Sequence, residues 1–366
     1  MDAADRILRA NGNPELVDRI LQDECRRKAS RKLATTLSCP GFRFPTMLSA
    51  EQCTSDAVAE YHAGLIEPGQ TVVDLTCGLG IDAFHCARRA STVLAIDIDP
   101  LVTDAVEPNA RELGIANVHA ICADCCEWLK ETPALKFDVA FIDPARRGAN
   151  GQRLFSLHDC QPDVTKLMPD IERIASKVII KMSPMLDVKK VISELPHVTT
   201  LHIIGTASEC KELVAEIDFE GHGPTRIVAA TLGGHNLEFT EGDEEPETYA
   251  GTVAPGLTIG EPWPAVVKAA PKGLLNGDKL HVNSHLWLNP GEDFPGKIYR
   301  VERVETFSSS TCRKLAKEGL AASVATRNFP LSADALRSKL KCTESDKLRI
   351  VGTTLSDGKR VLIFMS

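Results

Sequence analysis

The chain of 366 residues has 42 basic and 50 acidic side chains, a net charge of −8, and 43% hydrophobic residues. At roughly 150 residues per domain, this length predicts two to three globular domains, and the net charge argues against uniformly basic, histone-like binding of nucleic acid. No stretch approaches the ~20 apolar residues of a membrane span, and residues 1–10 lack the pattern of a signal peptide. Because the twelve cysteines are spread along the chain, we expect reduced thiols in a cytoplasmic protein.

Residues 1–67 are predicted to form a helical N-terminal domain. Apolar residues recur there at helical spacing, and Asn13-Pro14 is typical of an N-cap followed by proline in the first turn. The basic residues between 26 and 32 are interpreted either as exposed helix charges or as a surface that faces phosphates. A second helix is expected from Ser49, where Gln52 three positions later resembles a capping box, to the breaker Glu67-Pro68-Gly69.

Residues 68–239 alternate between apolar strand-like runs and helix-length segments. This alternation predicts an α/β fold with a doubly wound, Rossmann-like parallel sheet that is covered on both faces. Two runs after Gly205 have no convincing helix between them, which predicts an antiparallel edge. The expected strands are 71–75, 92–96, 118–123, 137–142, 177–181, 200–204, 213–219 and 226–232.

The acidic stretch Thr240–Thr248 is predicted to be a linker, and two small α+β modules are expected after it, in residues 240–292 and 293–366. Residues 281–366 contain 14 basic and 9 acidic side chains, so this end of the chain is interpreted either as a surface for an anionic partner or as a solvated basic face. The expected elements are a helix after Pro264, strands at 281–288, 297–304, 348–353 and 360–364, and a helix at 331–340 with Ser332 as its N-cap.

The segment from Asp74 to Asp82 contains the clearest chemical pattern in the sequence. A strand ends at Asp74, a turn with Gly78 and Gly80 follows, and a helix begins near Asp82. Glycine at these positions lets the backbone approach a bound ligand closely. The spacing D-x-x-x-G-x-G differs from the G-x-G-x-x-G of diphosphate sites, so it favours a nucleoside cofactor that carries an amino acid.

Three further carboxylates follow consecutive predicted strands. Asp97 is placed to accept hydrogen bonds from both ribose hydroxyls, Asp124 to accept from an adenine amino group, and Asp143 begins the run Asp143-Pro144-Ala145-Arg146-Arg147. Open α/β sheets bind ligands at the carboxyl ends of their strands. The ordered set therefore predicts one continuous site.

These motifs resemble those of class I S-adenosylmethionine-dependent methyltransferases over about residues 68–235. More narrowly, the D-P-A-R-R run, the segment Glu261–Lys268 and the R-N-F-P-L-S segment Arg327–Ser332 resemble the bacterial THUMP-like class I methyltransferases. The resemblance implies a ferredoxin-like domain (240–292), a THUMP-like domain (293–366), S-adenosyl-L-methionine as cofactor and RNA, tRNA or rRNA, as substrate.

The predicted site residues fall into three groups. The cofactor would be bound by Asp74, Thr76, Cys77, Gly78, Gly80, Asp82, Asp97, Ile98, Asp124 and Cys125. The catalytic set would be Asp143, Pro144, Arg146 and Lys181. RNA would be bound by Arg313, Lys314, Lys317, Arg327, Arg337, Lys339 and Lys341.

The methylated atom is open to several interpretations. Asp143 suits methylation of a base nitrogen, because a carboxylate can accept the hydrogens of an amino group, although Ala145 replaces the aromatic residue that stacks on the base in related enzymes. Carbon-5 methylation would need a cysteine nucleophile, and neither Ala145 nor Met182-Ser183-Pro184 supplies one.

Lys181 after the fifth strand resembles part of the Lys-Asp-Lys-Glu set of ribose 2′-O-methyltransferases, whose first lysine and glutamate have no assignable positions here. A non-catalytic RNA-binding protein and a small-molecule methyltransferase are the remaining alternatives.

We expect no metal site at Cys122, Cys125 and Cys126, because no second cysteine pair completes a set of four ligands.

Overall fold

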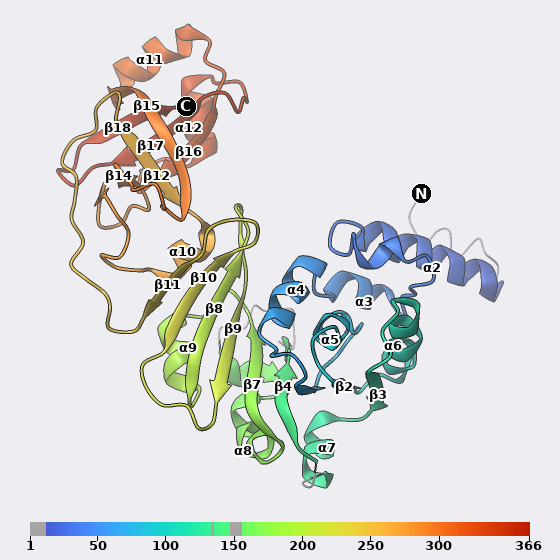
Figure 1. Cartoon of the computed structure of the whole chain (residues 1–366). Helices are drawn as coiled ribbons and strands as arrows, with labels where there is room; N and C mark the ends of the chain where they lie inside the picture. Colours follow the sequence, from blue (N-terminus) through green and yellow to red (C-terminus); the bar gives the residue numbers. More distant parts are fainter. Residues whose placement is uncertain (1–11, 133–134, 147–155) are drawn as a thin grey trace. The chain divides into compact units, whose positions relative to one another are not determined.

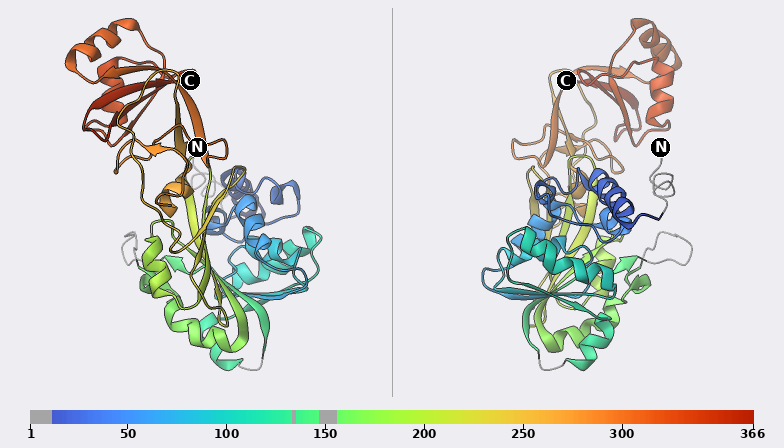
Figure 2. Two further views of the ribbon diagram at one scale, coloured as in Figure 1. Left: turned by 60° about the vertical axis from the view of Figure 1, so that its left-hand side comes forward. Right: turned by 90° about the vertical axis from the view of Figure 1, so that its right-hand side faces the viewer.

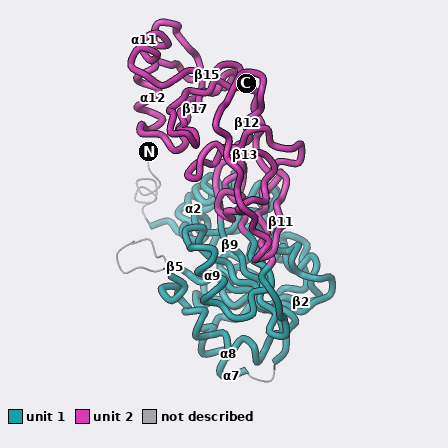
Figure 3. Tube along the Cα trace, turned by 90° about the vertical axis from the view of Figure 1, so that its left-hand side faces the viewer, with its two compact units in different colours: residues 1–202, 212–225 teal, residues 203–211, 226–366 magenta. Residues whose placement is uncertain are grey.

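The computed structural model describes residues 12–132, 135–146 and 156–366. The chain divides into two compact units, residues 1–202 with 212–225 and residues 203–211 with 226–366 (Figure 3). The helical periodicity of residues 1–11 and the position of Arg147 fall outside the described residues. Among the described helices, none combines the length and apolar character that crossing a membrane requires.

The first sheet has the strand order β11-β10-β8-β9-β7-β4-β1-β2-β3. The neighbours β4–β7, β1–β4, β1–β2 and β2–β3 are parallel, and β9 pairs antiparallel with β7. The predicted α/β class and antiparallel edge are thereby confirmed. The strands are β1 (Thr71–Asp74), β2 (Thr92–Asp97), β3 (Val118–Cys122), β4 (Phe137–Ile142), β7 (Ala175–Met182), β8 (Val198–Gly205), β9 (Cys210–Asp218), β10 (Arg226–Thr231) and β11 (Leu237–Thr240).

The register of the parallel strands brings their carboxyl ends together. Asp74 is paired with Phe141 on one side and with Ala95 on the other, and Asp97 is paired with Cys122. The central strands β1 and β4 are buried over most of their length, as their nearly continuous apolar sequences require. The segments that follow β1, β2, β3 and β4 therefore leave the sheet at one edge.

Helices cover both faces of this parallel sheet (Figures 1 and 2). On one face α4 packs against α5, and α6 packs against β2 and β3; on the other face α7 packs against α8. The helices and short elements of this unit are α2 (Pro14–Ala29), η1 (Thr36–Ser38), α3 (Met47–Gln52), α4 (Asp56–Gly64), α5 (Ile81–Ala87), α6 (Pro100–Glu112), α7 (Cys125–Glu131), β5 (Ala145–Arg146), η2 (Leu157–Asp159), β6 (Cys160–Gln161), α8 (Val164–Ile174) and α9 (Val188–Glu194).

The helical N-terminal region differs from the sequence prediction in one respect. Asn13 caps α2 as expected, because its side chain accepts the Glu15 and Leu16 amides. The single helix expected from Ser49 is wrong, because the chain forms α3, capped by Thr46, and then α4. The helix cannot continue through the break, since the Asp56 amide donates to the Lys32 carbonyl at 2.8 Å. At this break the buried side chain of Thr54 contacts Lys181 on β7 and Asp82 on α5.

The second unit contains a seven-stranded sheet with the order β13-β14-β12-β15-β18-β17-β16. The helix after Pro264 and the Ser332 cap are confirmed. The strand predicted at 281–288 is wrong except at its end, because hydrogen bonds from Ser284 and Asn283 to His281 form a turn there. The elements are β12 (Thr258–Pro262), α10 (Pro264–Ala269), β13 (Asp278–Lys279), β14 (Trp287–Leu288), β15 (Gly296–Thr306), α11 (Ser309–Glu318), β16 (Ser323–Arg327), α12 (Ala333–Leu340), β17 (Arg349–Thr354) and β18 (Arg360–Met365).

Candidate active site

The carboxyl ends of β1 and β4 are joined by a hydrogen bond. The Asp143 amide donates to Thr76 Oγ1 at 2.8 Å, and the Thr76 amide donates to Asp74 Oδ1 at 3.2 Å. Asp74 is only 2% exposed, and burial raises the pKa of its carboxyl well above the usual value. These contacts fix the position of Asp143 relative to the turn that follows β1.

The turn between β1 and α5 has an open backbone. Gly78 has a φ of 52°, and a Cβ there would meet no described heavy atom within 4 Å outside its immediate neighbours. The Gly78 amide donates to Asp97 Oδ2 at 2.9 Å, and Asp97 Oδ1 accepts the Asp99 amide at 3.0 Å. Next to Asp97, the side chain of Ile98 is 67% exposed. An open glycine backbone, a carboxylate acceptor and an exposed apolar side chain fit an adenosine-containing cofactor.

The end of β3 places three candidate ligands for a metal ion close together. The ligand atoms of Asp124, Cys125 and Cys126 lie within 4.8 Å of one another. Asp124 also caps α7 by accepting the Cys126 amide at 2.8 Å, and burial is the main cause that raises the pKa of Cys125 to about 12. With its pKa raised in this way, Cys125 is held as a neutral thiol at neutral pH. All twelve cysteines lie within the described residues and are free.

Lys181 and Asp143 form an ion pair at the ends of β7 and β4. Lys181 Nζ lies 2.6 Å from Asp143 Oδ2. The Lys181 side chain is 12% exposed, whereas the Asp143 side chain is 40% exposed. The ammonium group thus lies on the protein side of the pair, and the carboxylate faces solvent.

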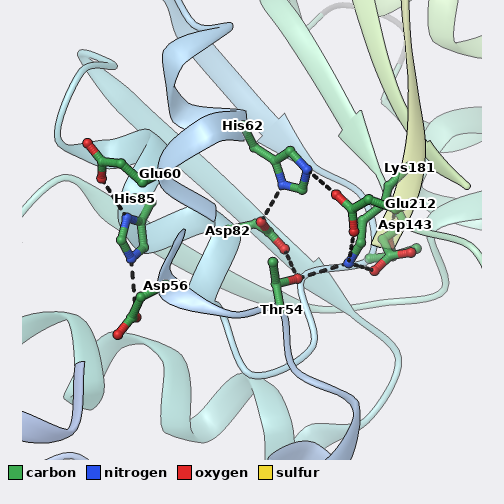
Figure 4. A network of polar contacts seen from close by, with 10 residues as sticks. Thr54, Asp56, Glu60, His62, Asp82, His85, Asp143, Lys181 and Glu212 are labelled. Carbon is green, nitrogen blue, oxygen red and sulfur yellow. Dashed lines mark hydrogen bonds and ion pairs between the residues drawn. The ribbon is translucent and has the colours of Figure 1, made fainter. Parts of the chain in front are cut away.

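Three side chains that the sequence analysis did not identify contact this pair or its neighbours (Figure 4). Lys181 Nζ donates to Thr54 Oγ1 at 2.9 Å and lies 3.8 Å from Glu212 Oε2. Thr54 donates to Asp82 Oδ2 at 2.5 Å. His62 lies between Asp82 and Glu212, with Nδ1 at 2.8 Å from Asp82 Oδ1 and Nε2 at 2.5 Å from Glu212 Oε1.

The charges in this network shift the pKa values of its members. Burial alone would lower the pKa of Lys181, but Asp143, Asp82 and Glu212 outweigh burial and raise it. Burial likewise opposes the protonation of His62, yet Asp82 and Glu212 raise its pKa to about 9. Burial raises the pKa of Asp143, and Lys181 opposes this effect. At neutral pH the network therefore contains one ammonium and one imidazolium.

The structure places the remaining predicted residues of this site as follows. Asp82, which was grouped with the cofactor-binding residues, has both carboxylate oxygens engaged by Thr54 and His62. Cys77 is buried, and Gly80 has a φ of 87° with Phe84 beside its Cα. Pro144 is buried and Ala145 is exposed, while the Arg146 side chain lies outside the described residues.

A further carboxylate near Lys181 comes from the antiparallel strand β9. Glu212 on β9 lies 3.8 Å from Lys181 Nζ, and it is buried next to the apolar run Leu213–Ala215. His62 lies on the buried face of α4 with Val58, Ala59 and Ala63. A charged or imidazole side chain at an apolar position of a helix or strand is the sequence signal that identifies such residues.

The predicted RNA-binding residues lie on α11, β16 and α12 of the second unit. Arg327 is partly buried, and it and Arg349 pair with the carboxylate of Glu261. Arg337 pairs with Glu344 at 3.1 Å. The exposed cations among the candidates are Arg313, Lys314, Lys317, Lys339 and Lys341.

The parallel sheet, the antiparallel edge and the polar strand ends define a class I methyltransferase fold. The methyltransferase domain model matches residues 72–147, and the THUMP domain-like model matches residues 296–366. The chain is 28% identical to an uncharacterized S-adenosylmethionine-dependent methyltransferase of Mycobacterium tuberculosis (strain H37Rv), over 91% of each chain. It is also similar to a crystal structure assigned to the methyltransferases from Porphyromonas gingivalis W83, with 29% identity, a TM-score of 0.89, and coverage of 100% of this chain and 94% of that one.

A shorter similarity involves enzymes that modify RNA. The chain is 36% identical to a 23S rRNA uracil-C5 methyltransferase of Stenotrophomonas maltophilia, over 23% of this chain and 20% of that one. The chain described here is a THUMP-like class I S-adenosylmethionine-dependent methyltransferase, and S-adenosylmethionine is its cofactor. This identification sets aside the non-catalytic alternative.

Proposed function

We propose that the enzyme methylates an exocyclic or ring nitrogen of a base in structured RNA, either tRNA or rRNA. The observation that carries this proposal is the geometry of Asp143. Its carboxylate lies at the end of β4 and is 40% exposed, and Lys181 contacts only its inner oxygen, Oδ2. Because Oδ1 is not paired with Lys181 within the described part of the chain, it can accept a hydrogen bond from the acceptor base.

The chemistry that we assign to Asp143 follows from the electronic structure of a base amino group. The nitrogen lone pair is delocalised into the ring, and a carboxylate that accepts the N–H hydrogens favours the tetrahedral geometry needed for attack. The bound cofactor supplies an electrophilic methyl group on a sulfonium centre. Asp143 orients the nitrogen and accepts the proton that leaves, and positioning supplies much of the remaining rate. Pro144 fixes the backbone next to Asp143, because its ring restricts φ.

We propose that the cofactor is held by the residues around the β1–α5 turn. Asp97 would accept from the ribose hydroxyls, the open side of Gly78 would admit the amino-acid portion, and Ile98 would pack on the adenine. Asp124 would accept from the adenine amino group. Asp74, Thr76, Cys77, Gly80 and Cys125 would shape the surrounding backbone.

Calorimetric titration with S-adenosylmethionine tests this assignment. Asp97→Ala should abolish measurable binding while the thermal unfolding temperature stays near that of the wild type. Asp170→Ala is a suitable control, because Asp170 pairs with Arg173 on the surface of α8. Binding by Asp97→Ala with wild-type affinity would contradict the assignment.

Ribose 2′-O-methylation is the second candidate, and the surroundings of Lys181 favour it. The ammonium contacts both Asp143 and Glu212, and its raised pKa keeps it protonated. A protonated lysine can stabilise the negative charge that develops on an attacking hydroxyl oxygen. In that reaction Asp143 would orient the hydroxyl and accept its proton, and Lys181 would stabilise the negative charge that develops on the oxygen.

Carbon-5 methylation is disfavoured, although the chain has a short match, over 23% of its length, to a uracil-C5 methyltransferase. The nucleophile of that chemistry is a cysteine thiolate. Met182 and Ser183 stand where the resemblance would require it, and both are buried. Cys53 comes directly before Thr54 in the sequence. Burial is the main cause that raises the pKa of the Cys53 thiol, which keeps the sulfur protonated.

The decisive experiment is methyl transfer from labelled S-adenosylmethionine to RNA from a strain that lacks the enzyme. Nucleoside mass spectrometry of the product should show one N-methylated base, and Asp143→Ala should lose the transfer while Asp170→Ala keeps it. A 2′-O-methyl nucleoside would establish the second candidate instead. No transfer to RNA would overturn both candidates.

With RNA as substrate and free thiols throughout, we expect the enzyme to act in the cytoplasm.

A further inference from the structure

One buried histidine in the network has no role in the chemistry described above. His62 is 0% exposed, and its two ring nitrogens lie 2.8 Å from Asp82 and 2.5 Å from Glu212. Two carboxylates at hydrogen-bond distance require a hydrogen on each nitrogen, so the ring is an imidazolium. His62 therefore fixes the positions of two carboxylates from different parts of the chain, one on α5 and one on β9.

Both carboxylates lead to the same ammonium group. Glu212 uses Oε1 for His62 and presents Oε2 to Lys181 Nζ at 3.8 Å. Asp82 uses Oδ1 for His62 and Oδ2 for the Thr54 hydroxyl, which accepts a hydrogen bond from Lys181 Nζ at 2.9 Å. Two arms, one through Glu212 and one through Asp82 and Thr54, therefore converge on Lys181.

The two arms determine where the ammonium can lie. The side chains of Asp82, Glu212 and Lys181 are only 11%, 8% and 12% exposed. Water therefore cannot readily replace the protein groups that they contact. The Asp143 side chain is 40% exposed, more than the other charged side chains of the network, and it faces the acceptor in the proposed reaction. Any shift of Lys181 would rotate the Asp143 carboxylate with it.

We propose that His62 is a positioning residue that acts through Glu212 and Asp82 to hold Lys181 against Asp143. This inference rests on the proposed function, because it assigns Asp143 to the acceptor. A purely structural histidine would change stability alone. A positioning histidine must also change turnover, since small displacements of reacting groups lower rates steeply.

The chain offers a matched control in His85 on α5. His85 is 4% exposed and also lies between two carboxylates, with Nδ1 at 3.0 Å from Glu60 and Nε2 at 3.5 Å from Asp56. None of these contacts reaches Lys181 (Figure 4). His62→Gln and His85→Gln therefore each replace a buried histidine that lies between two carboxylates, although Glu60 is 69% exposed. Only the first substitution disturbs the two arms.

The first measurement is steady-state methyl transfer to RNA from a strain that lacks the enzyme. We expect His62→Gln to lower kcat by about 10- to 100-fold, with the KM for S-adenosylmethionine changed by less than about threefold. His85→Gln should leave kcat near the wild-type value. If His62→Gln is too unstable to study, Glu212→Gln and Thr54→Val cut one arm each and should each lower kcat. Equal effects of the His62 and His85 variants would overturn the inference.

The second measurement does not depend on activity. In ¹⁵N spectra of the lysine side chains, Lys181 should give a signal protected from solvent exchange, which Lys181→Arg identifies by its loss. The signal should disappear in His62→Gln and persist in His85→Gln. If the wild type methylates no RNA, the proposed function fails, and these spectra still decide whether His62 positions Lys181. A protected Lys181 signal in His62→Gln would refute the positioning role.

Discussion

Lys181 is the cation on which three carboxylates depend. It contacts Asp143 at 2.6 Å and Glu212 at 3.8 Å, and it reaches Asp82 through the Thr54 hydroxyl. Removing one partner of a buried ion pair leaves charge that neither water nor protein compensates. We therefore expect Lys181 to stabilise the fold as well as to act in the reaction.

We predict that Lys181→Met lowers the free energy of unfolding by about 3 kcal/mol, the magnitude found when a buried pair loses one partner. Lys190→Met is the control, because Lys190 pairs with Glu194 at 3.5 Å on the surface of α9 and its side chain is 50% exposed. Such an exposed pair contributes less than about 1 kcal/mol. Urea denaturation measures both, and equal losses would show that the Lys181 contacts are weak.

His62 should make stability depend on pH. Its pKa of about 9 in the folded chain lies above the ordinary 6.5, so the folded state holds this proton more tightly than the unfolded state. The stabilisation is complete below about pH 6.5 and is lost as the pH rises through 9, and it amounts to about 3 kcal/mol. The difference in unfolding free energy between the wild type and His62→Gln should shrink between pH 6.5 and 9. A constant difference across this range would mean that His62 is neutral.

Among the elements, the turn between β1 and α5 allows its two glycines to be separated experimentally. A Cβ on Gly80 would lie 2.7 Å from the ring of Phe84, whereas a Cβ on Gly78 would point into open space. We predict that Gly80→Ala destabilises the fold by more than the about 1 kcal/mol expected from a positive φ alone. Gly78→Ala should lose only about that amount, and it should still bind S-adenosylmethionine more weakly by calorimetry. Unchanged affinity of Gly78→Ala would place the cofactor elsewhere.

The strands of the catalytic sheet could be predicted closely from sequence, whereas the division of the helical segment after Ser49 into two helices could not. The runs at 71–75, 92–96 and 137–142 match β1, β2 and β4 within a residue, because continuous apolar runs end at carboxylates and turns. The break between α3 and α4 depends on partners distant in sequence. Thr54 binds Asp82, 28 positions away, and no local pattern indicates this contact.

The same distinction explains which site residues could be predicted. Asp143 and Lys181 each follow a predicted strand, so the sheet order implies that they meet. His62 and Glu212 are 150 positions apart and belong to a helix and to the antiparallel strand β9. Their contact depends on the three-dimensional packing of α4, which sequence periodicity does not specify.

At the scale of the whole molecule, the acidic chain carries its excess of cations at the C-terminal end. Residues 281–366 hold 14 basic and 9 acidic side chains, although Arg327 and Arg349 are used by Glu261. The cations of α11, Arg313, Lys314 and Lys317, are exposed, and Lys314 lies 3.9 Å from Glu305. RNA binding by this surface would release counterions and would therefore weaken as salt rises.

We predict that replacing Arg313, Lys314 and Lys317 with alanine lowers RNA affinity and reduces the slope of log Kd against log salt by about 2. Fluorescence anisotropy with a labelled tRNA or rRNA fragment at several salt concentrations measures the slope. The control replaces Lys130, Lys166 and Lys177, whose side chains are 58%, 81% and 49% exposed. An equal change in slope for the two triple variants would indicate binding without a preferred surface.

The break between α3 and α4 bears on where the chain can be truncated for expression. An expression fragment that starts just ahead of β1 retains every methyltransferase signature in the sequence, yet it discards Thr54 and His62. Such a truncated protein would keep the glycine turn and Asp97 but leave Lys181 without two of the groups that support it. The segment ahead of β1 thus supplies Thr54, which contacts Lys181, and His62, which contacts Asp82 and Glu212.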